Sequence, residues 1–418
     1  MPHIIVIGAG AVGVCCAYYL RKKGFHVTVV DRGRIGAACS AGNAGLIVPS
    51  HVIPLAAPGV VSQGLKWLFR RDSPFYIRPR LDPALWSWVW RFTRHCNNSA
   101  VAKSTPVLHD LLQRSAHLFD ELFQAHEQAF YYRKKGLLMV YRQDKYRRAL
   151  QQDADTAAAL GIAVRHLSQQ ELVQLEPHAP ARSAGAFYYP NDAHLDPTQF
   201  IQALVDRLSD QGVTFLENTE VTGLEQENGQ VTGIAAASGP LKGDMVLIAS
   251  GSWSPLLAGP KVLPLPVEAG KGYSITLDQP KITPTFPMIL SEEKATITPL
   301  GDRIRFAGTL ELSGLDHRVN RARFESVVAV APQYQPDFQV DRLDESRIWH
   351  GFRPCTPDGL PIIGRSKRHP NLLVATGHAM LGITLAPITG SLIANLAAET
   401  GGEQAITLNA LSPFRFSH

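Results

Sequence analysis

The residues best suited to chemistry in this sequence lie within its first 31 positions. Gly8, Gly10 and Gly13 follow the apolar run at residues 4–7, and Asp31 comes 18 residues after Gly13. Glycines at this spacing let a backbone approach a pyrophosphate closely, and the amino end of a helix favours its negative charge. An acid at this distance can accept a hydrogen bond from a ribose hydroxyl. The pattern predicts a dinucleotide site, and because Asp31 would repel a 2′-phosphate, we expect NAD or FAD rather than NADP.

The elements that must position this site alternate between strand and helix. The β-branched run at 4–7 predicts a buried parallel strand, residues 14–23 follow a helical register, and residues 26–30 predict a second strand. Farther along, Thr105 and Pro106 predict the start of a long amphipathic helix. No second glycine motif of this kind follows, which disfavours a flavoenzyme reduced by NAD through two such units.

Composition excludes several classes of protein. Lys and Arg number 41 against 36 Asp and Glu, and a net charge of +5 is too small for 418 residues to indicate nucleic-acid binding. The five Cys residues form no CxxC pair, so we expect neither a disulfide framework nor a metal site. The amino-terminal residues lack the basic segment of a secretory signal, which favours a cytoplasmic protein.

One segment, residues 61–94, has a charge excess equal to that of the whole chain. Interleaved Trp and Arg are typical of a surface that contacts a membrane or a partner, so this segment predicts peripheral contact with the inner face of the membrane. The alternative is a packed cover, with three Trp residues on a half-buried strand or on one face of a helix. The residues concerned are Lys66, Arg70, Arg71, Arg78, Arg80, Arg91 and Arg94, against Asp72 and Asp82, with Trp67, Trp86, Trp88 and Trp90.

Four further segments complete a recognisable set. Small polar residues fill 40–45, residues 249–254 end an apolar strand with a glycine turn, and glycine-containing segments follow at 351–359 and 377–384. Together with the amino-terminal motif, and in this order, they resemble the D-amino acid oxidase-like superfamily of FAD enzymes. The resemblance is closest to its bacterial D-amino acid dehydrogenases. It extends from residue 4 to about residue 398 and includes the proline-containing segment at 49–59.

The resemblance implies an α/β fold in which a Rossmann-like FAD-binding domain is interleaved with an α+β substrate domain built on a mostly antiparallel sheet. The FAD-binding domain would comprise residues 1–50, 190–257 and 346–418, and the substrate domain residues 51–189 and 258–345. FAD would be held non-covalently, because Cys355 does not match the cysteine that carries the flavin in sarcosine oxidase relatives.

The resemblance also assigns residues to the cofactor. The glycine motif would bind the pyrophosphate, Asp31 the ribose and Val221 the adenine, while later segments would line the flavin. At residues 382–384, backbone N–H groups and a helix start would face the flavin edge that becomes negative on reduction. The expected cofactor residues are Gly8, Gly10, Ala11, Val12, Gly13, Asp31, Arg32, Ser40, Asn43, Ala44, Gly45, Leu46, Val221, Ser250, Gly251, Trp253, Gly382, Ile383 and Thr384.

Arg353 is the residue expected to bind the substrate. A guanidinium can form a bidentate pair with a carboxylate, and the resemblance gives this role to the matching arginine. Tyr273 would approach the same carboxylate and act with Arg353 in catalysis. His51 and His378 are further expected substrate contacts. For each of these four residues, a structural role is the alternative.

The chemistry implied is the oxidative deamination of a D-amino or D-imino acid. Hydride would leave the substrate Cα for flavin N5, and the imino acid would hydrolyse to a 2-oxo acid and ammonia. The electrons would pass to a quinone or another carrier. Three alternatives stay open: a D-hydroxyproline or D-proline dehydrogenase, a glycine- or sarcosine-type oxidase that uses oxygen, and a flavin-binding subunit of a larger complex.

Overall fold

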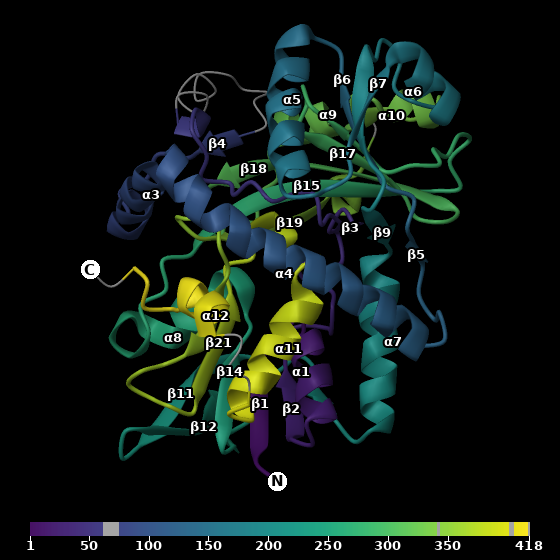
Figure 1. The fold of residues 1–418 in the computed structure, drawn as a ribbon. Coiled ribbons are helices and arrows are strands. Elements are labelled where there is room, and N and C mark those ends of the chain that lie inside the picture. The colour runs from purple at the N-terminus through teal and green to yellow at the C-terminus, as the bar shows by residue number, and fades with distance from the viewer. Residues whose placement is uncertain (62–74, 341–342, 401–404, 417–418) are drawn as a thin grey trace.

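The computed structural model describes residues 1–61, 75–340, 343–400 and 405–416. Two large sheets organise these residues, and each draws strands from distant parts of the chain (Figure 1). The first sheet has six strands, which are β1 (His3–Ile7), β2 (His26–Val30), β10 (Thr214–Leu216), β14 (Met245–Ile248), β20 (Ile362–Arg365) and β21 (Leu372–Thr376). Their order is β10-β2-β1-β14-β21-β20, and every pair is parallel except β20 with β21.

Side-chain alternation along β1 explains how both faces of this sheet are covered. Ile4 and Val6 pack into a core with three helices, whereas Ile5 and Ile7 point to the opposite face, against a small sheet and α8. A strand buried on both faces is what the continuous apolar run predicts. The covering elements are α1 (Ala11–Lys22), α7 (Pro197–Asp210) and α11 (Ala386–Ala397) on one face, and β11 (Val221–Glu227), β12 (Gln230–Ala236), β13 (Leu241–Lys242) and α8 (Ser254–Val262) on the other.

Among the described residues, the second sheet has nine strands and is mostly antiparallel, since only β16 with β6 and β18 with β4 pair in parallel. Its order is β19-β15-β18-β17-β16-β6-β8-β7, with β4 beside β18. The strands are β4 (Phe75–Ile77), β6 (Leu137–Tyr141), β7 (Arg165–Ser168), β8 (Gly185–Tyr189), β15 (Glu268–Asp278), β16 (Met288–Leu290), β17 (Ala295–Pro299), β18 (Arg303–Leu312) and β19 (Trp349–Cys355). Figure 1 shows this sheet in the upper half of the molecule.

The two faces of the second sheet have different partners. Tyr273, Ile275 and Leu277 of β15 pack into a core beneath α9 (Arg321–Val328) and α10 (Ala331–Tyr334). The intervening residues of β15 point away from these helices, because side chains alternate along a strand. This second face meets the loop after β2, because Arg305 of β18 donates hydrogen bonds to carbonyl oxygens of that loop.

The long helix α4 (Asn98–Ala125) crosses the middle of the molecule (Figure 1). It begins seven positions before the expected start at Thr105, so that prediction is wrong. Asn97 Oδ1 accepts the N–H of Ala100 and caps the helix. Pro106 lies inside the helix, where its missing N–H leaves the carbonyl of Ala102 without its usual partner.

Shorter elements complete the fold. Within the described ranges, no helix is both long enough and apolar enough to cross a membrane. The first sheet takes its strands from residues 3–30, 214–248 and 362–376, and the second takes its strands from residues 75–189 and 268–355. The remaining elements are β3 (Leu46–Ile47), β5 (Tyr132–Arg133) and β9 (Ala193–Leu195), which form a small sheet, and α3 (Pro83–His95), α5 (Asp144–Ala159), α6 (Gln169–Leu175) and α12 (Ala405–Leu411).

Candidate functional site

The turn between β1 and α1 is shaped for close approach by another group. Gly8 has a φ of 110°, and a Cβ there would lie 2.6 Å from the carbonyl oxygen of Ala249. A Cβ on Gly13 would overlap the carbonyl oxygen of Gly8. Both positions therefore require glycine. No hydrogen bond joins the N–H of Val12 or Gly13 to another described residue, so the amino end of α1 retains donors for an anion.

Asp31 and Ser40 hold this turn from the side. The carboxylate of Asp31 accepts the N–H of Ala9 at 2.8 Å and that of Gly33 at 2.9 Å. Ser40 Oγ accepts the N–H of Ala11 at 3.0 Å. The structure thus brings the expected ribose ligand and a residue of the 40–46 segment to the same glycine turn.

The expected adenosine and strand-end residues also meet near Asp31. The carbonyl oxygen of Asp31 accepts the N–H of Thr219 at 2.8 Å, two residues before Val221 begins β11. The guanidinium of Arg32 lies over the Trp253 ring, 4.0 Å from its centroid. Ser250 and Gly251 lie on the turn after β14, and the carbonyl oxygen of Gly251 accepts a hydrogen bond from Thr376 at 2.9 Å.

The two segments expected at the flavin are adjacent although 338 positions separate them. Thr384 Oγ1 donates a hydrogen bond to the carbonyl oxygen of Leu46 at 2.9 Å. Within the earlier segment, the N–H of Gly45 donates to Asn43 Oδ1 at 2.9 Å. Ser115 of α4 donates to the carbonyl oxygen of Thr384 at 2.6 Å, just before α11 begins. Gly382, Ile383 and Ala44 lie within these same two segments.

Arg353 lies on the face of the second sheet that points away from α9. It is opposite Gly270 of β15, and a Cβ on Gly272 would overlap its guanidinium. Its Nη1 donates to the carbonyl oxygen of Thr309 at 2.5 Å, and no described carboxylate forms an ion pair with it. Burial lowers the pKa of Arg353, yet its side chain keeps accessible surface.

Sequence reasoning missed two residues on this face, Arg305 and Trp349. Arg305 of β18 donates from Nη1 to the carbonyl oxygens of Ala41 at 2.8 Å and Asn43 at 2.6 Å. The ring of Trp349 would be overlapped by a Cβ on Gly42. These contacts dock the loop after β2 onto the second sheet. Neither residue belongs to a motif. The only signal in the sequence is that Trp349 and Arg353 are four positions apart, so that on one strand their side chains point to the same face.

Tyr273 lies on the other face, which corrects the expectation that it shares a carboxylate with Arg353. It is opposite His350 in the β15–β19 register, whereas Arg353 is opposite Gly270, and neighbouring positions of a strand point to opposite faces. Tyr273 is fully buried beneath α9, and its hydroxyl oxygen accepts the N–H of Asn320 at 2.9 Å. Burial raises its pKa well above the ordinary range.

His378 also has a structural role, against the expectation of a substrate contact. Its ring is buried, and its Nε2 lies 2.9 Å from Thr389 Oγ1 of α11. Because Thr389 Oγ1 donates to the carbonyl oxygen of Leu385, the histidine is the donor of the pair. Burial lowers the pKa of His378 to about 3, so the ring is neutral.

His51 remains partly accessible and ends a chain of hydrogen bonds. Its Nδ1 lies 3.1 Å from Ser50 Oγ, which donates to Asp192 Oδ2 at 2.5 Å. Burial lowers the pKa of His51 to about 4 and raises the pKa of the fully buried Asp192 to about 7. His51 lies on the segment that runs from Leu46 to Pro54, and Pro54 lies beside Gly359 of the loop after β19.

Helix α3 covers the end of the second sheet next to Arg353. Trp88 Nε1 donates to the carbonyl oxygen of Cys355 at 2.9 Å, and Phe92 stacks on Trp88 with centroids 5.0 Å apart. The thiol of Cys355 is buried, which raises its pKa to about 12. Arg80, which precedes the helix, pairs with the buried Glu268 at 2.7 Å.

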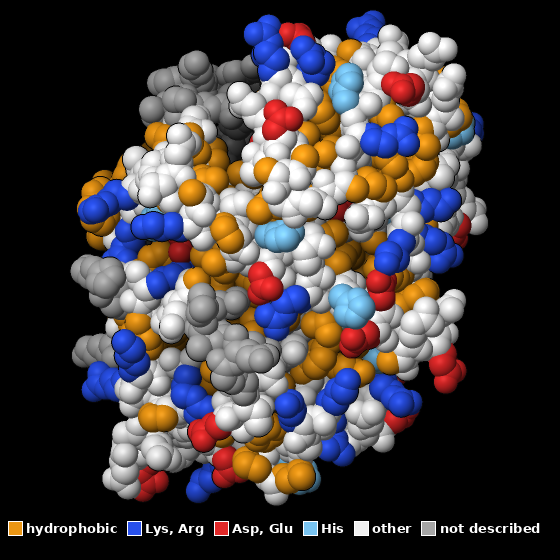
Figure 2. Space-filling view, viewed as in Figure 1, with side chains coloured by type: hydrophobic (Ala, Val, Ile, Leu, Met, Phe, Trp, Pro, Cys, Tyr) orange, Lys and Arg blue, Asp and Glu red, His pale blue; other side chains and the backbone are white. Residues whose placement is uncertain are grey.

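The outer side of α3 carries the other two described Trp residues of the 61–94 segment. Trp86 and Trp90 are 52 % and 59 % exposed, and the guanidinium of Arg94 lies over the Trp90 ring. Figure 2 shows basic and hydrophobic side chains together over α3. The three Trp residues are therefore helical, not on a strand. Lys66, Trp67, Arg70, Arg71 and Asp72 lie outside the described residues.

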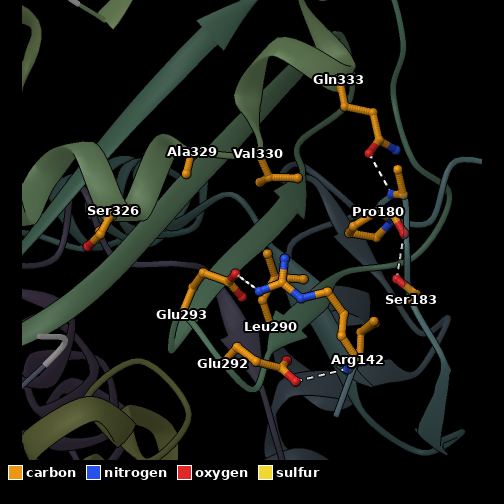
Figure 3. A pocket seen from close by; sticks show the side chains of 13 residues that line it. Arg142, Pro180, Ser183, Leu290, Glu292, Glu293, Ser326, Ala329, Val330 and Gln333 are labelled. Carbon is orange, nitrogen blue, oxygen red and sulfur yellow. Dashed lines mark hydrogen bonds and ion pairs between the residues drawn. The ribbon is translucent and has the colours of Figure 1, made fainter. Parts of the chain in front are cut away.

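A separate pocket of about 210 Å³ opens between the end of β6, the turn after β16 and the α9–α10 junction. Arg142 pairs with Glu293, and Glu292 accepts the N–H of Arg142 at 2.9 Å (Figure 3). Gln333 accepts the N–H of Ala181 at 2.8 Å. These polar groups of the pocket are paired with one another. None of the expected site residues lines the pocket, so it is not the candidate site.

The family described as "DAO: FAD dependent oxidoreductase" matches residues 3–396. Among curated relatives, the "D-amino acid dehydrogenase" of Vibrio vulnificus (strain YJ016) is 33 % identical over 419 residues, which cover 99 % of each chain. The protein of the same name from Vibrio cholerae serotype O1 (strain M66-2) is 34 % identical over 425 residues, covering 100 % of this chain and 99 % of that protein.

Solved structures agree with this fold. Glycine oxidase from Geobacillus kaustophilus superposes with a TM-score of 0.76 at 22 % identity and covers 99 % of both chains. L-proline dehydrogenase from P. horikoshii superposes with a TM-score of 0.72 at 20 % identity and covers 100 % of this chain and 98 % of that one. At these identities the superpositions establish the fold.

Proposed function

The chain belongs to the DAO family of FAD-dependent oxidoreductases, and on this basis we propose that it oxidises D-amino acids whose carboxylate is held by Arg353. The observation that carries the proposal is that Arg353 is partly exposed and has no acidic partner among the described residues. It lies on a face of the sheet where Gly270 and Gly272 have no side chains to occupy the space. The D configuration is supported by the names of relatives at 33 % and 34 % identity.

The described residues fit FAD. The glycine turn leaves the Val12 and Gly13 N–H groups available for a pyrophosphate. The Asn43–Leu46 segment and Thr384 are adjacent, because Thr384 donates a hydrogen bond to the carbonyl oxygen of Leu46. Bound FAD supplies the acceptor for a hydride. Cofactor attachment is proposed to be non-covalent, because the thiol of Cys355 is buried under α3.

The residues of the chain have two tasks in this reaction, which are to hold the substrate carboxylate and to exclude water. Arg353, fixed by the carbonyl oxygen of Thr309, binds and orients the substrate carboxylate. The amine must be neutral, so that its lone pair forms the C=N bond while the Cα–H bond leaves with its electron pair. Helix α3 and the residues beneath it exclude water from the end of the sheet. The product iminium then adds water and releases ammonia, leaving the 2-oxo acid.

The electrons are proposed to leave for a quinone or another carrier. The dehydrogenase names of the relatives support a carrier, whereas the glycine oxidase fold would equally accommodate oxygen. Cyclic imino acids such as D-proline and D-hydroxyproline are included among the substrates, because direct hydride loss from Cα needs no primary amine. The proline dehydrogenase superposition is consistent with such a ring in this fold.

The outer face of α3 is proposed to contact the membrane. Trp86, Trp90 and Arg94 combine exposed aromatic rings with positive charge, and Leu81 before the helix is fully exposed. Such a face can insert its rings at the headgroup level while its bases meet anionic lipids. This location would give a membrane quinone access to the protein.

A substrate panel tests the proposal. The holoenzyme is assayed with D- and L-amino acids, D-proline and D-hydroxyproline, with dye reduction and oxygen consumption followed in parallel. We expect dye reduction with D-substrates, with 2-oxo acid and ammonia formed in equal amounts from primary amines. The proposal would be refuted if the enzyme turned over none of the D-amino or D-imino acids. Oxygen consumption as fast as dye reduction would show that oxygen, and not a carrier, accepts the electrons.

A further inference from the structure

Arg305 is a buried cation at the junction of the two sheets. Only 5 % of it is exposed. Its Nε donates to Thr276 Oγ1 at 2.9 Å, and its Nη1 donates to the carbonyl oxygens of Ala41 and Asn43. All three acceptors are neutral oxygens.

No described acid forms an ion pair with Arg305. Asp196 interacts with it electrostatically, but Asp196 forms its ion pair with Arg303 and caps α7 through Thr198. Burial lowers the pKa of Arg305 to about 10, which reflects the unfavourable environment of the charge. A buried cation held only by neutral groups is expensive unless an anion joins it.

The two carbonyls that hold Arg305 belong to the loop that continues into the Asn43–Leu46 segment. That segment accepts a hydrogen bond from Thr384, two residues before α11, and both segments are the ones expected at the flavin. A flavin gains negative charge when it is reduced. A fixed positive charge in a site that excludes water stabilises such developing charge without reorganisation.

We propose that Arg305 is a positioning residue that raises the reduction potential of the bound flavin. Its positive charge forms no ion pair with a described acid, and its hydrogen bonds to the carbonyl oxygens of Ala41 and Asn43 hold that charge beside the loop. The effect requires bound FAD but no particular substrate. The proposal therefore rests on the FAD binding of the proposed function and does not depend on D-amino acid turnover.

The test separates the charge of Arg305 from its hydrogen bonds. Arg305→Lys keeps the charge, and Arg305→Gln keeps a donor without it. The midpoint potential of the FAD-loaded protein is measured by slow enzymatic reduction beside a reference dye, with no amino acid present. We expect Arg305→Gln to disfavour reduction by about ten-fold, which for two electrons is about 30 mV, and Arg305→Lys to stay near the parent.

A second variant changes Thr276, which accepts a hydrogen bond from Arg305, so that the charge of Arg305 is paired with an acid. Thr276→Glu places an acid beside Arg305 Nε, and it should lower the potential as Arg305→Gln does, even if the glutamine variant loses FAD. Arg318→Gln is the control, because Arg318 is 74 % exposed and paired with Asp316. Unchanged potentials in the FAD-loaded Thr276→Glu protein, or equal shifts in Arg305→Lys and Arg305→Gln, would overturn the proposal.

Discussion

Gly272 lies directly beneath the guanidinium of Arg353, so that a Cβ at this position would overlap Nη1, Cζ and Nη2. Gly272→Ala should therefore displace Arg353 without touching the cofactor segments. We expect kcat/KM for the best D-amino acid to fall roughly 10- to 100-fold, mainly through KM, because hydrogen bonds to charged groups contribute about 1.5–3 kcal/mol. Steady-state kinetics, with flavin content checked by absorbance, measure this.

Gly223→Ala is the matched control for this variant. Gly223 lies on β11, where a Cβ would meet no atom within 4 Å and the backbone does not require glycine. Its kinetics should equal those of the parent. An unchanged KM in Gly272→Ala would show that the substrate does not depend on the position of Arg353.

Gly13→Ala should yield a protein without flavin. Its Cβ would overlap the carbonyl oxygen of Gly8, and α1 would have to move away from the turn whose N–H groups are proposed to bind the pyrophosphate. We expect little flavin absorbance in the purified variant and no recovery after incubation with FAD. Full flavin content in a folded Gly13→Ala protein would contradict the placement of the cofactor at this turn.

Asp192→Asn should change how stability depends on pH. Burial raises the pKa of Asp192 from 3.8 to about 7, so between these values the folded state binds a proton that the unfolded state lacks. Stability from this group is therefore present at low pH and is lost as pH rises toward 7, by up to about 1.4 kcal/mol per pH unit. Relative to the parent, the variant should gain stability from about pH 4 to about pH 7.

Denaturant unfolding across this pH range measures the difference between the two proteins. Asp206→Asn, at an exposed position of α7, is the control and should run parallel to the parent. Parallel curves for parent and Asp192→Asn would mean that Asp192 ionises in the folded protein as it does in the unfolded chain.

Replacing both Trp86 and Trp90 with Ser should weaken co-sedimentation with vesicles that contain anionic lipid. Burying a large apolar side chain contributes about 1.5–3 kcal/mol, so losing two rings should reduce binding at least ten-fold. The control replaces Val173 and Leu256, which are exposed elsewhere, with Ser. Sedimentation unaffected by the Trp substitutions would remove α3 from the membrane proposal.

The expected cofactor residues follow from local patterns in the sequence. The glycines of the first turn and the turn before α11 are expected to act through their own backbone, and the carboxylate of Asp31, just after β2, accepts the N–H groups of Ala9 and Gly33. Spacing along the chain fixes such features. The docking of Thr384 on Leu46 follows once both segments are placed at the same cofactor.

The substrate half depended on which face of a strand each residue occupies. Tyr273 and Arg353 come from neighbouring strands, and a shift of one residue in register decides whether they meet. The sequence does not predict the role of Arg305, because its partners Ala41 and Asn43 lie more than 260 positions away and accept through backbone carbonyl oxygens. The start of α4 was misplaced because Thr105 and Pro106 imitate a helix start inside the helix.

Anaerobic reduction of the flavin tests the central claim most directly. The FAD-loaded protein and its Arg353→Met variant are mixed with one amino acid in its D and L forms, and loss of flavin absorbance is followed in time. We predict rapid bleaching by the D form alone, and at least about 100-fold slower bleaching at low substrate concentration in the variant, as expected when a charge-assisted carboxylate contact is lost. Equal bleaching by both enantiomers, or an FAD-loaded variant as fast as the parent, would contradict the account.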